Sequence, residues 1–229
     1  MKTIGLIGGM SWESTGEYYR IINTTIRNQL GGLHSAKCVL YSVDFHEVEK
    51  CQSNGDWDTI AHTLSQAAMC LEKAGADFVA ICSNTIHKVA DEIQNHISVP
   101  IVHIADVTAE QIISSSFSRV GILGTRFTLE EDFYINRLIS KGIQVVIPER
   151  EDREKIDRII FDELCLGIIR PESKETYLEV INKLTTKGAQ AVILGCTEIG
   201  LLVNQGDVKV PLFDTCYIHA YQAAMLALV

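Results

Sequence analysis

The chain has 229 residues, of which 47% are hydrophobic and 21% charged, and its formal net charge is −9 at pH 7. These values are typical of a globular protein with a sizeable core, built as one large or two small domains. The negative charge argues against nucleic acid or an anionic membrane as a partner, but it leaves an anionic small substrate open. No apolar run is long enough to span a bilayer, and the sequence starts in a strand pattern without a signal peptide, so we expect a cytoplasmic protein.

The seven cysteines do not form a recognisable framework. Their number is odd and no CxxC pair occurs, so neither a disulfide scaffold nor a cysteine zinc site is expected. No histidine pair has the spacing of metal ligands, and the glycines near the N-terminus lack the spacing of a dinucleotide-binding or phosphate-binding loop. We therefore expect no metal site and no nucleotide cofactor held by such a loop.

Strand patterns alternate with helix patterns along the whole chain, which is typical of a parallel α/β protein. In the first half, strands are expected at residues 3–8, 38–43, 78–81 and 99–103, and the polar stretch 51–55 is interpreted as a loop. In the second half, strands are expected at residues 119–124, at residues 142–147, in the segment that ends at Cys196, and at residues 210–213. Helices are expected at residues 106–116, 128–138, 151–166, 172–187 and 216–228. Thr128 and Glu131 match a capping box for the helix over 128–138.

Three segments of the first half repeat in the second half without gaps, at shifts of 111 to 116 residues. Residues 119–124 repeat 3–8, residues 188–198 repeat 75–85, and residues 210–213 repeat 99–102. We predict two similar pseudo-symmetric α/β halves, each with a parallel sheet of roughly four strands flanked by helices, and a site in the cleft between them. The predicted division is residues 1–103, residues 104–214, and a C-terminal helix, residues 215–229, that packs back on the N-terminal half.

Small or polar residues end four of the expected strands, each directly before a helix. The four segments are Gly8–Ser11, Ser83–Thr85, Gly124–Thr125 and Cys196–Glu198. Helix N-termini offer free N–H groups and a partial positive charge at this edge of a parallel sheet, which suits a ligand that carries carboxylates. The alternative, that Asn84, Thr85 and Thr197 only cap their own helices, stays open for each residue taken singly.

Cys196 differs from the other cysteines because it ends an apolar strand at a helix start. That position lowers a thiol pKa and provides a thiolate, which acts as a nucleophile or a base. The repeat places Ser83, and not the neighbouring Cys82, opposite Cys196. His87 is the one histidine near the predicted site, and we interpret it as a structural or supporting group rather than a ligand.

At these residues the chain resembles the aspartate/glutamate racemase family, the cofactor-independent amino-acid racemases. Three motifs carry the resemblance: Gly8–Ser11, Asn84-Thr85-Ile86-His87 and Gly195–Glu198. The resemblance implies two similar halves with the substrate between them, a homodimer, and catalysis without pyridoxal phosphate or metal. It also implies two cysteines, one from each half, that remove the α-proton from one face and return a proton to the other. The chain is therefore expected to be an isomerase that racemises aspartate or glutamate.

Carried over residue by residue, the resemblance implies two catalytic positions and a set of substrate-binding positions. The catalytic positions are Ser83 and Cys196. The substrate-binding positions are Met10, Gln52, Ser83, Asn84, Thr85, Thr125, Thr197 and Glu198. Most of these would hold carboxylates, whereas Glu198 could instead bind the substrate ammonium.

The sequence departs from the family pattern at the first catalytic position. The family motif is Cys-Asn-Thr-x-His, and here Ser83 stands in place of its cysteine. Cys82 is one position earlier, and because side chains alternate across a strand its thiol is expected to be packed on the other face. We predict an asymmetric pair, with Cys196 as the thiolate base and Ser83 as the proton donor on the opposite face. By analogy with the family, this pair favours the L-enantiomer as starting substrate.

Two other functions fit the same residues. A decarboxylase of malonate-like acids needs only one cysteine, and an isomerase of unsaturated diacids is a related possibility on this fold. A non-catalytic dicarboxylate-binding protein would bind its ligand without exchanging an α-proton. Glu198 beside Cys196 favours an amino acid over these, because a substrate ammonium needs a partner.

Overall fold

The computed structural model describes all 229 residues, and the chain divides into two compact units. Unit one comprises residues Met1–Ile104 and His219–Val229, and unit two comprises residues Ala105–Ile218. The chain therefore crosses between the units twice, after Ile104 and after Ile218. Each unit has its own sheet and its own apolar core.

Unit one contains a parallel sheet with the strand order β2-β1-β3-β4. Its strands are β1 (Ile4–Gly8), β2 (Cys38–Ser42), β3 (Phe78–Ile81) and β4 (Ile101–Val102). Every residue of β1 and β3 is buried, as expected for central strands of a parallel sheet that is covered on both faces. Ile7 pairs with Ile81, so both strands end at the same edge of the sheet.

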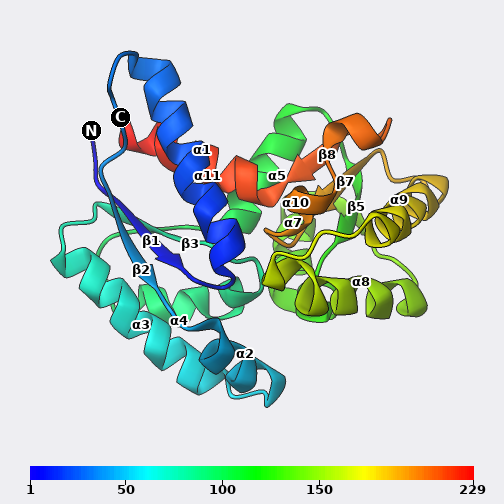
Figure 1. Cartoon of the computed structure of the whole chain (residues 1–229), viewed down its shortest axis with the longest axis horizontal. Helices are drawn as coiled ribbons and strands as arrows, with labels where there is room; N and C mark the ends of the chain where they lie inside the picture. Colours follow the sequence, from blue (N-terminus) through cyan, green and yellow to red (C-terminus); the bar gives the residue numbers. More distant parts are fainter. The chain divides into compact units, whose positions relative to one another are not determined.

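Helices cover both faces of this sheet, with α3 and α4 on one face and α1 on the other (Figure 1). The helical segments are α1 (Trp12–Leu30), α2 (Phe45–Ser53), α3 (Trp57–Lys73), the 3-10 turn η1 (Thr85–Val89) and α4 (Ala90–Gln94). α3 brings Ile60, Leu64 and Leu71 to one helix face, and all three are buried in the core of the unit. Burial of each such side chain stabilises the fold by about 1.5–3 kcal/mol.

Unit two repeats the same sheet, with the order β6-β5-β7-β8 and all pairs parallel. Its strands are β5 (Arg119–Leu123), β6 (Gln144–Val146), β7 (Ala191–Leu194) and β8 (Leu212–Asp214). Leu123 pairs with Leu194 in the place where Ile7 pairs with Ile81 in unit one. The predicted α/β class with two similar four-stranded parallel sheets is confirmed.

The helical segments of unit two are α6 (Arg126–Glu130), α7 (Asp132–Ser140), α8 (Arg150–Asp162), η2 (Leu164–Leu166), α9 (Pro171–Thr186), α10 (Ile199–Leu202) and η3 (Gln205–Asp207). α8 and α9 join the sheet in one core that contains Ile156, Tyr177 and Leu184, all buried. None of the helices in the chain has the length and apolar composition required to cross a membrane.

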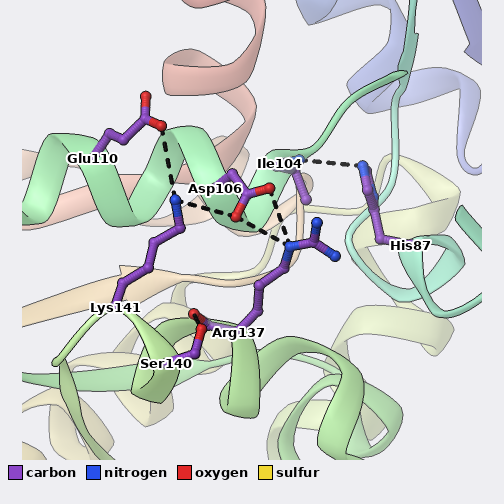
Figure 2. Close-up of polar contacts among 7 residues, drawn as sticks. All are labelled: His87, Ile104, Asp106, Glu110, Arg137, Ser140 and Lys141. Atoms are coloured by element: carbon purple, nitrogen blue, oxygen red, sulfur yellow. Dashed lines mark hydrogen bonds and ion pairs between the residues drawn. The ribbon is translucent and has the colours of Figure 1, made fainter. Parts of the chain in front are cut away.

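Two helices contain the crossings between the units, α5 (Ile104–Ser114) and α11 (Thr215–Ala227). In unit two, Asp106 of α5 accepts from the Nε of Arg137 at 3.1 Å and pairs with the Nζ of Lys141 at 3.4 Å (Figure 2). Lys141 also lies 3.8 Å from Glu110 one turn further along α5. These partly exposed pairs fix α5 against α7, although each contributes only about 0–1 kcal/mol.

Two local expectations are wrong. Residues 51–55 do not form a free loop, because α2 extends to Ser53 and begins after Asp44, whose carboxylate accepts from the His46 N–H at 3.0 Å. Only Val48 and Gln52 of α2 are buried, so the sequence has no hydrophobic periodicity that would indicate a helix here. The Thr128 capping box is also absent: Thr125 caps α6, and a separate helix, α7, starts after Glu131.

Candidate active site

The end of β7 is shaped by the close approach of two backbone segments at Gly195. The Gly195 N–H donates to the carbonyl of Leu123 at 2.6 Å. A Cβ at this position would lie 2.7 Å from the same oxygen, so only glycine fits without a shift of backbone. The chain then places Cys196, Thr197 and Glu198 between the strand and α10.

Cys196 and Glu198 are directly hydrogen-bonded in unit two. The Cys196 Sγ donates to Glu198 Oε2 at 2.9 Å, and the Thr197 hydroxyl donates to the same oxygen at 3.0 Å. The side chains are buried, with Glu198 only 1% exposed and Cys196 8% exposed. A buried carboxylate that accepts two such bonds is held in one orientation, with the thiol proton pointing at it.

The expectation that the Cys196 pKa is lowered is wrong. Burial raises the pKa of the thiol well above its ordinary value, and the negative charge of Glu198 raises it further. The helix that follows has only four residues, Ile199–Leu202, so its dipole is too short to offset these effects. Cys196 is therefore a protonated thiol at rest, and it becomes a base only after its proton moves to an acceptor.

The end of β3 in unit one has the same backbone arrangement as the end of β7. The Cys82 N–H donates to the carbonyl of Ile7 at 2.8 Å, which is the counterpart of the Gly195–Leu123 bond. Cys82 thus occupies the place of Gly195, and Ser83 occupies the place of Cys196. The two sheets independently give the same pairing as the sequence repeat.

Cys82 is fully buried, whereas Ser83 is 7% exposed. Burial raises the pKa of the Cys82 thiol far above its ordinary value, and no charged partner offsets this effect. A thiol in such an environment stays protonated and unreactive. Cys82 therefore has the properties of a packed side chain.

The remaining predicted substrate-binding residues are divided between the units, and all are buried. Unit one holds Met10, Gln52, Asn84 and Thr85; unit two holds Thr125, Thr197 and Glu198. Met10 belongs to the apolar core of unit one, so its side chain packs rather than projects. The structure brings together Thr197 and Glu198 with Cys196 through hydrogen bonds, as described above.

The helix-capping alternative concerns Asn84, Thr85 and Thr197. It does not hold for Asn84, which stands at the N-cap of η1 without a side-chain capping bond. Thr125, which that alternative does not include, caps α6, and its hydroxyl accepts from the Thr128 N–H at 3.4 Å. Thr197 precedes the N-cap of α10, which is Glu198, and that position also lacks a side-chain capping bond.

The turn after β1 depends on Gly9 and Thr15. Gly9 has a φ of +95°, and a Cβ there would lie 2.3 Å from the carbonyl oxygen of Val43. The Gly9 N–H donates to the Thr15 hydroxyl at 2.9 Å, and that hydroxyl donates to the Ser11 carbonyl at 2.8 Å. Thr15 was not identified from sequence, because a threonine inside a helix carries no distinguishing local signal.

Unit one also contains a cavity beside α2 and α3. The cavity has a volume of about 400 Å³ and is lined by residues of α2 and α3, among them Glu47, Lys50, Cys51 and Thr59, but none of the predicted site residues lines it. No group of three His, Cys, Asp or Glu side chains is arranged to hold a metal ion.

Comparison with known proteins gives a family match over most of the chain. The family described as Asp/Glu/hydantoin racemase matches residues 7–223. A curated relative, the broad-specificity amino-acid racemase RacX of Bacillus subtilis, is 26% identical over 163 residues, which cover 70% of this chain and 69% of the relative.

Solved structures agree with this match. A candidate Asp/Glu racemase from Yersinia pestis is 56% identical, with a TM-score of 0.92 and full coverage of both chains. An aspartate racemase homologue from Pyrococcus horikoshii is 39% identical, with a TM-score of 0.87 and full coverage of both chains. The fold of the whole chain is therefore the fold of these proteins.

Proposed function

Since the chain belongs to the Asp/Glu/hydantoin racemase family, we propose that it is a cofactor-independent racemase of an acidic amino acid, aspartate or glutamate. Removal and return of a proton at Cα is the reaction. Cys196 acts on one face of the substrate and Ser83 on the other. The similarity to the aspartate racemase homologue of Pyrococcus horikoshii supports an acidic substrate.

The bond between the Cys196 thiol and the buried Glu198 carboxylate is the observation that carries this proposal. A thiol with a raised pKa needs a nearby acceptor before it can remove a proton from carbon. Glu198 lies at hydrogen-bond distance from the thiol, and because it is only 1% exposed, bulk water compensates little of its charge in the folded protein. An arriving substrate ammonium would also compensate the charge of this carboxylate.

The proton path in the L to D direction follows from these contacts. The Cys196 thiol passes its proton to Glu198 Oε2, and the thiolate then takes the α-proton, which breaks the Cα–H bond. The Ser83 hydroxyl donates a proton to the opposite face of the carbanion and forms the new Cα–H bond. Afterwards Ser83 regains a proton from solvent and Glu198 returns its proton to solvent, so the enzyme is regenerated.

The pair is unequal, and this inequality has a measurable consequence. The equilibrium between isolated enantiomers is even, so the two directions of net racemisation have equal kcat/KM. Exchange of the α-proton with solvent is not bound by this equality. The L-substrate exchanges its α-proton through the Cys196 thiolate alone. The D-substrate must first lose its α-proton to Ser83, whose hydroxyl is a weak acid and is therefore rarely available as a base. We therefore propose faster solvent exchange from the L-enantiomer.

The carboxylates of the substrate would be held by the strand-end residues of both units. Asn84 and Thr85 follow β3, and Thr125 and Thr197 follow β5 and β7. Gln52 of α2 is buried and adds an amide that donates hydrogen bonds. Neutral donors of this kind bind carboxylates without a permanent positive charge.

The test is a racemisation assay on the purified protein. L-aspartate and L-glutamate are incubated separately, and the D-enantiomer is measured by chiral chromatography. Cys196→Ala should abolish product formation, and Cys82→Ala, which removes the neighbouring packed thiol, serves as the matched control. Binding of either amino acid without any D-product from the native protein would reject the racemase in favour of a binding protein.

One second function is favoured by a specific residue. Ser83 stands where a second cysteine would be needed for symmetric proton transfer. A decarboxylase of a substituted malonate needs only one thiol, because it protonates a carbanion on one face. Release of CO₂ from such a malonate, with no racemisation of amino acids, would select this function.

A further inference from the structure

The imidazoles of His87, His103 and His219 form a cluster in unit one, next to Ser83 in the case of His87. The chemistry proposed above uses none of them. The His87 and His103 ring centroids are 4.4 Å apart, and those of His87 and His219 are 5.8 Å apart. All three side chains are buried. His103 and His219 lie beside the two points at which the chain crosses between the units.

Both ring nitrogens of His87 have a backbone partner. Nδ1 lies 2.6 Å from the carbonyl oxygen of Ser83. Nε2 lies 3.2 Å from the backbone nitrogen of Ile104, the first residue of α5 (Figure 2). A backbone N–H can only donate, so Nε2 is the acceptor and the ring proton is on Nδ1. This tautomer donates to Ser83 and accepts from Ile104.

The two neighbouring rings pack against His87, and both ring nitrogens of His219 have partners other than His87. His219 Nε2 donates to the Val102 carbonyl at 2.7 Å, and its Nδ1 accepts from the Tyr18 hydroxyl at 2.8 Å. Burial lowers the pKa of His219 to about 4, so this ring is neutral at neutral pH. Its edge contact with His87, together with the tilted contact with His103, limits rotation of the His87 ring.

We propose that His87 is a positioning residue for Ser83, which it orients by donating the Nδ1 proton to the Ser83 carbonyl. The other ring nitrogen accepts from the first residue of α5. His87 therefore links the Ser83 backbone to a helix terminus and holds it in position. This role rests on the function proposed above. It matters because Ser83 has to point its hydroxyl at one face of a short-lived carbanion.

The carbanion can be reprotonated on either face, and the ratio of the two outcomes distinguishes a positioning role of His87 from a general structural role. After Cys196 removes the α-proton, return from the thiol side gives exchanged L-substrate, and donation from Ser83 gives D-product. Loss of the Ser83 orientation lowers inversion while leaving exchange intact. A collapsed or unfolded site would lower both rates together. In heavy water, the ratio of deuterated L-substrate to D-product measures this partition directly.

Two substitutions each preserve one of the two His87 bonds. His87→Asn places an amide nitrogen where Nδ1 is and keeps the donor to Ser83, but it is too short to accept from Ile104. His87→Gln extends an amide oxygen towards the Nε2 position and keeps the acceptor for Ile104, but it lacks the donor to Ser83. Both remain polar and of similar volume, and thermal unfolding verifies that each variant is folded.

The expected result is a ratio of exchange to inversion that is unchanged in His87→Asn and raised about tenfold to a hundredfold in His87→Gln, as for misplacement of a reacting group by about 1 Å. Equal ratios in the two variants, or a higher ratio in His87→Asn, would overturn the positioning role. A native protein with no exchange at all would instead reject the proposed racemase function.

A measurement on the native protein covers the case in which the variants do not fold. The ¹⁵N shifts of the His87 ring report which nitrogen carries the proton. A protonated Nδ1 and an unprotonated Nε2 are expected. The opposite tautomer would remove the bond to Ser83 and would refute the proposal.

Discussion

Replacement of Glu198 by Gln separates the acceptor role of this carboxylate from its effect on the Cys196 pKa. Gln has the same shape, and its amide oxygen can still accept from the Thr197 hydroxyl, which lies 3.0 Å from Glu198 Oε2 in the native protein. The substitution removes the negative charge and the ability to take up a proton. The fold should therefore be retained while the chemistry changes.

The magnitude follows from the distance between the two groups. Two like unit charges at 4 Å repel by about 4 kcal/mol at an effective dielectric constant of 20, and Sγ and Oε2 are closer, at 2.9 Å. A thiolate beside a glutamate anion is therefore strongly disfavoured, and the proton has to move to Glu198 as the thiolate forms. Loss of such a proton acceptor typically lowers a rate by about 10²–10⁴-fold, so we expect Glu198→Gln to lower kcat for L-substrate by about 100-fold or more.

The assay pairs turnover with alkylation of Cys196 by iodoacetamide, followed by peptide mass spectrometry. Removal of the Glu198 charge removes one cause of the raised thiol pKa, so alkylation at a fixed pH should become faster while turnover becomes slower. Opposite changes of the two rates are the signature of the acceptor role. Wild-type turnover in the variant, or a parallel fall of both rates, would refute the reasoning.

The remaining predictions concern the unit-one half of the site and the buried histidine. Cys82→Ala should leave at least half of the native turnover and cost about 1 kcal/mol of unfolding free energy, in line with loss of a small buried group; a dead but folded variant would show that the thiol, and not Ser83, faces the substrate. Ser83→Cys should raise solvent exchange from D-substrate about tenfold or more, because a thiol is a much better acid than a hydroxyl; an unchanged D-exchange rate would contradict the pairing of Ser83 with Cys196. The pKa of His219 is lowered to about 4 from its ordinary 6.5, so between pH 6.5 and pH 4 the unfolded chain binds a proton that the folded chain does not. With respect to this group the fold is therefore most stable above pH 6.5, and it loses stability as the pH falls towards 4. Between pH 7 and pH 5 this group alone should cost about 2 kcal/mol of unfolding free energy, and a denaturant titration of His219→Gln should lack that part of the pH dependence.

Much of the fold could be predicted from sequence because the repeat and the strand periodicity are carried by local patterns. The three matched segments, for example residues 188–198 on 75–85, include the strand pairs Ile7–Ile81 and Leu123–Leu194 that the two sheets share. The one-residue offset between Cys82 and Ser83 was visible for the same reason. Equivalent backbone hydrogen bonds at Cys82 and Gly195 result from this repeated pattern.

The electrostatic state of Cys196 could not be predicted in this way. A strand end followed by a helix indicates a lowered thiol pKa only when the helix is long enough and the thiol is exposed, and neither condition holds here. Burial and the direction of the Glu198 side chain are tertiary properties. The same applies to His219, whose partners Tyr18 and Val102 are distant in sequence.

The short helix α2 illustrates the local limit of prediction. Its nine residues bury only Val48 and Gln52, so no periodic apolar face distinguishes it from a polar loop. Its start depends on the Asp44 cap, a residue type that is equally common in turns. Gln52 was identified through the family resemblance alone, and its position on a helix became visible only in the structure.

The exchange of the α-proton in heavy water tests the central claim most directly. Purified protein is incubated separately with L- and D-aspartate and with L- and D-glutamate, and deuterium at Cα is followed by NMR, with Cys196→Ala and Cys82→Ala measured in parallel. An unequal pair of Cys196 and Ser83 predicts faster deuterium incorporation from the L-enantiomer, loss of exchange in Cys196→Ala and retention in Cys82→Ala. Equal exchange rates for the two enantiomers, or exchange that survives in Cys196→Ala, would contradict the account.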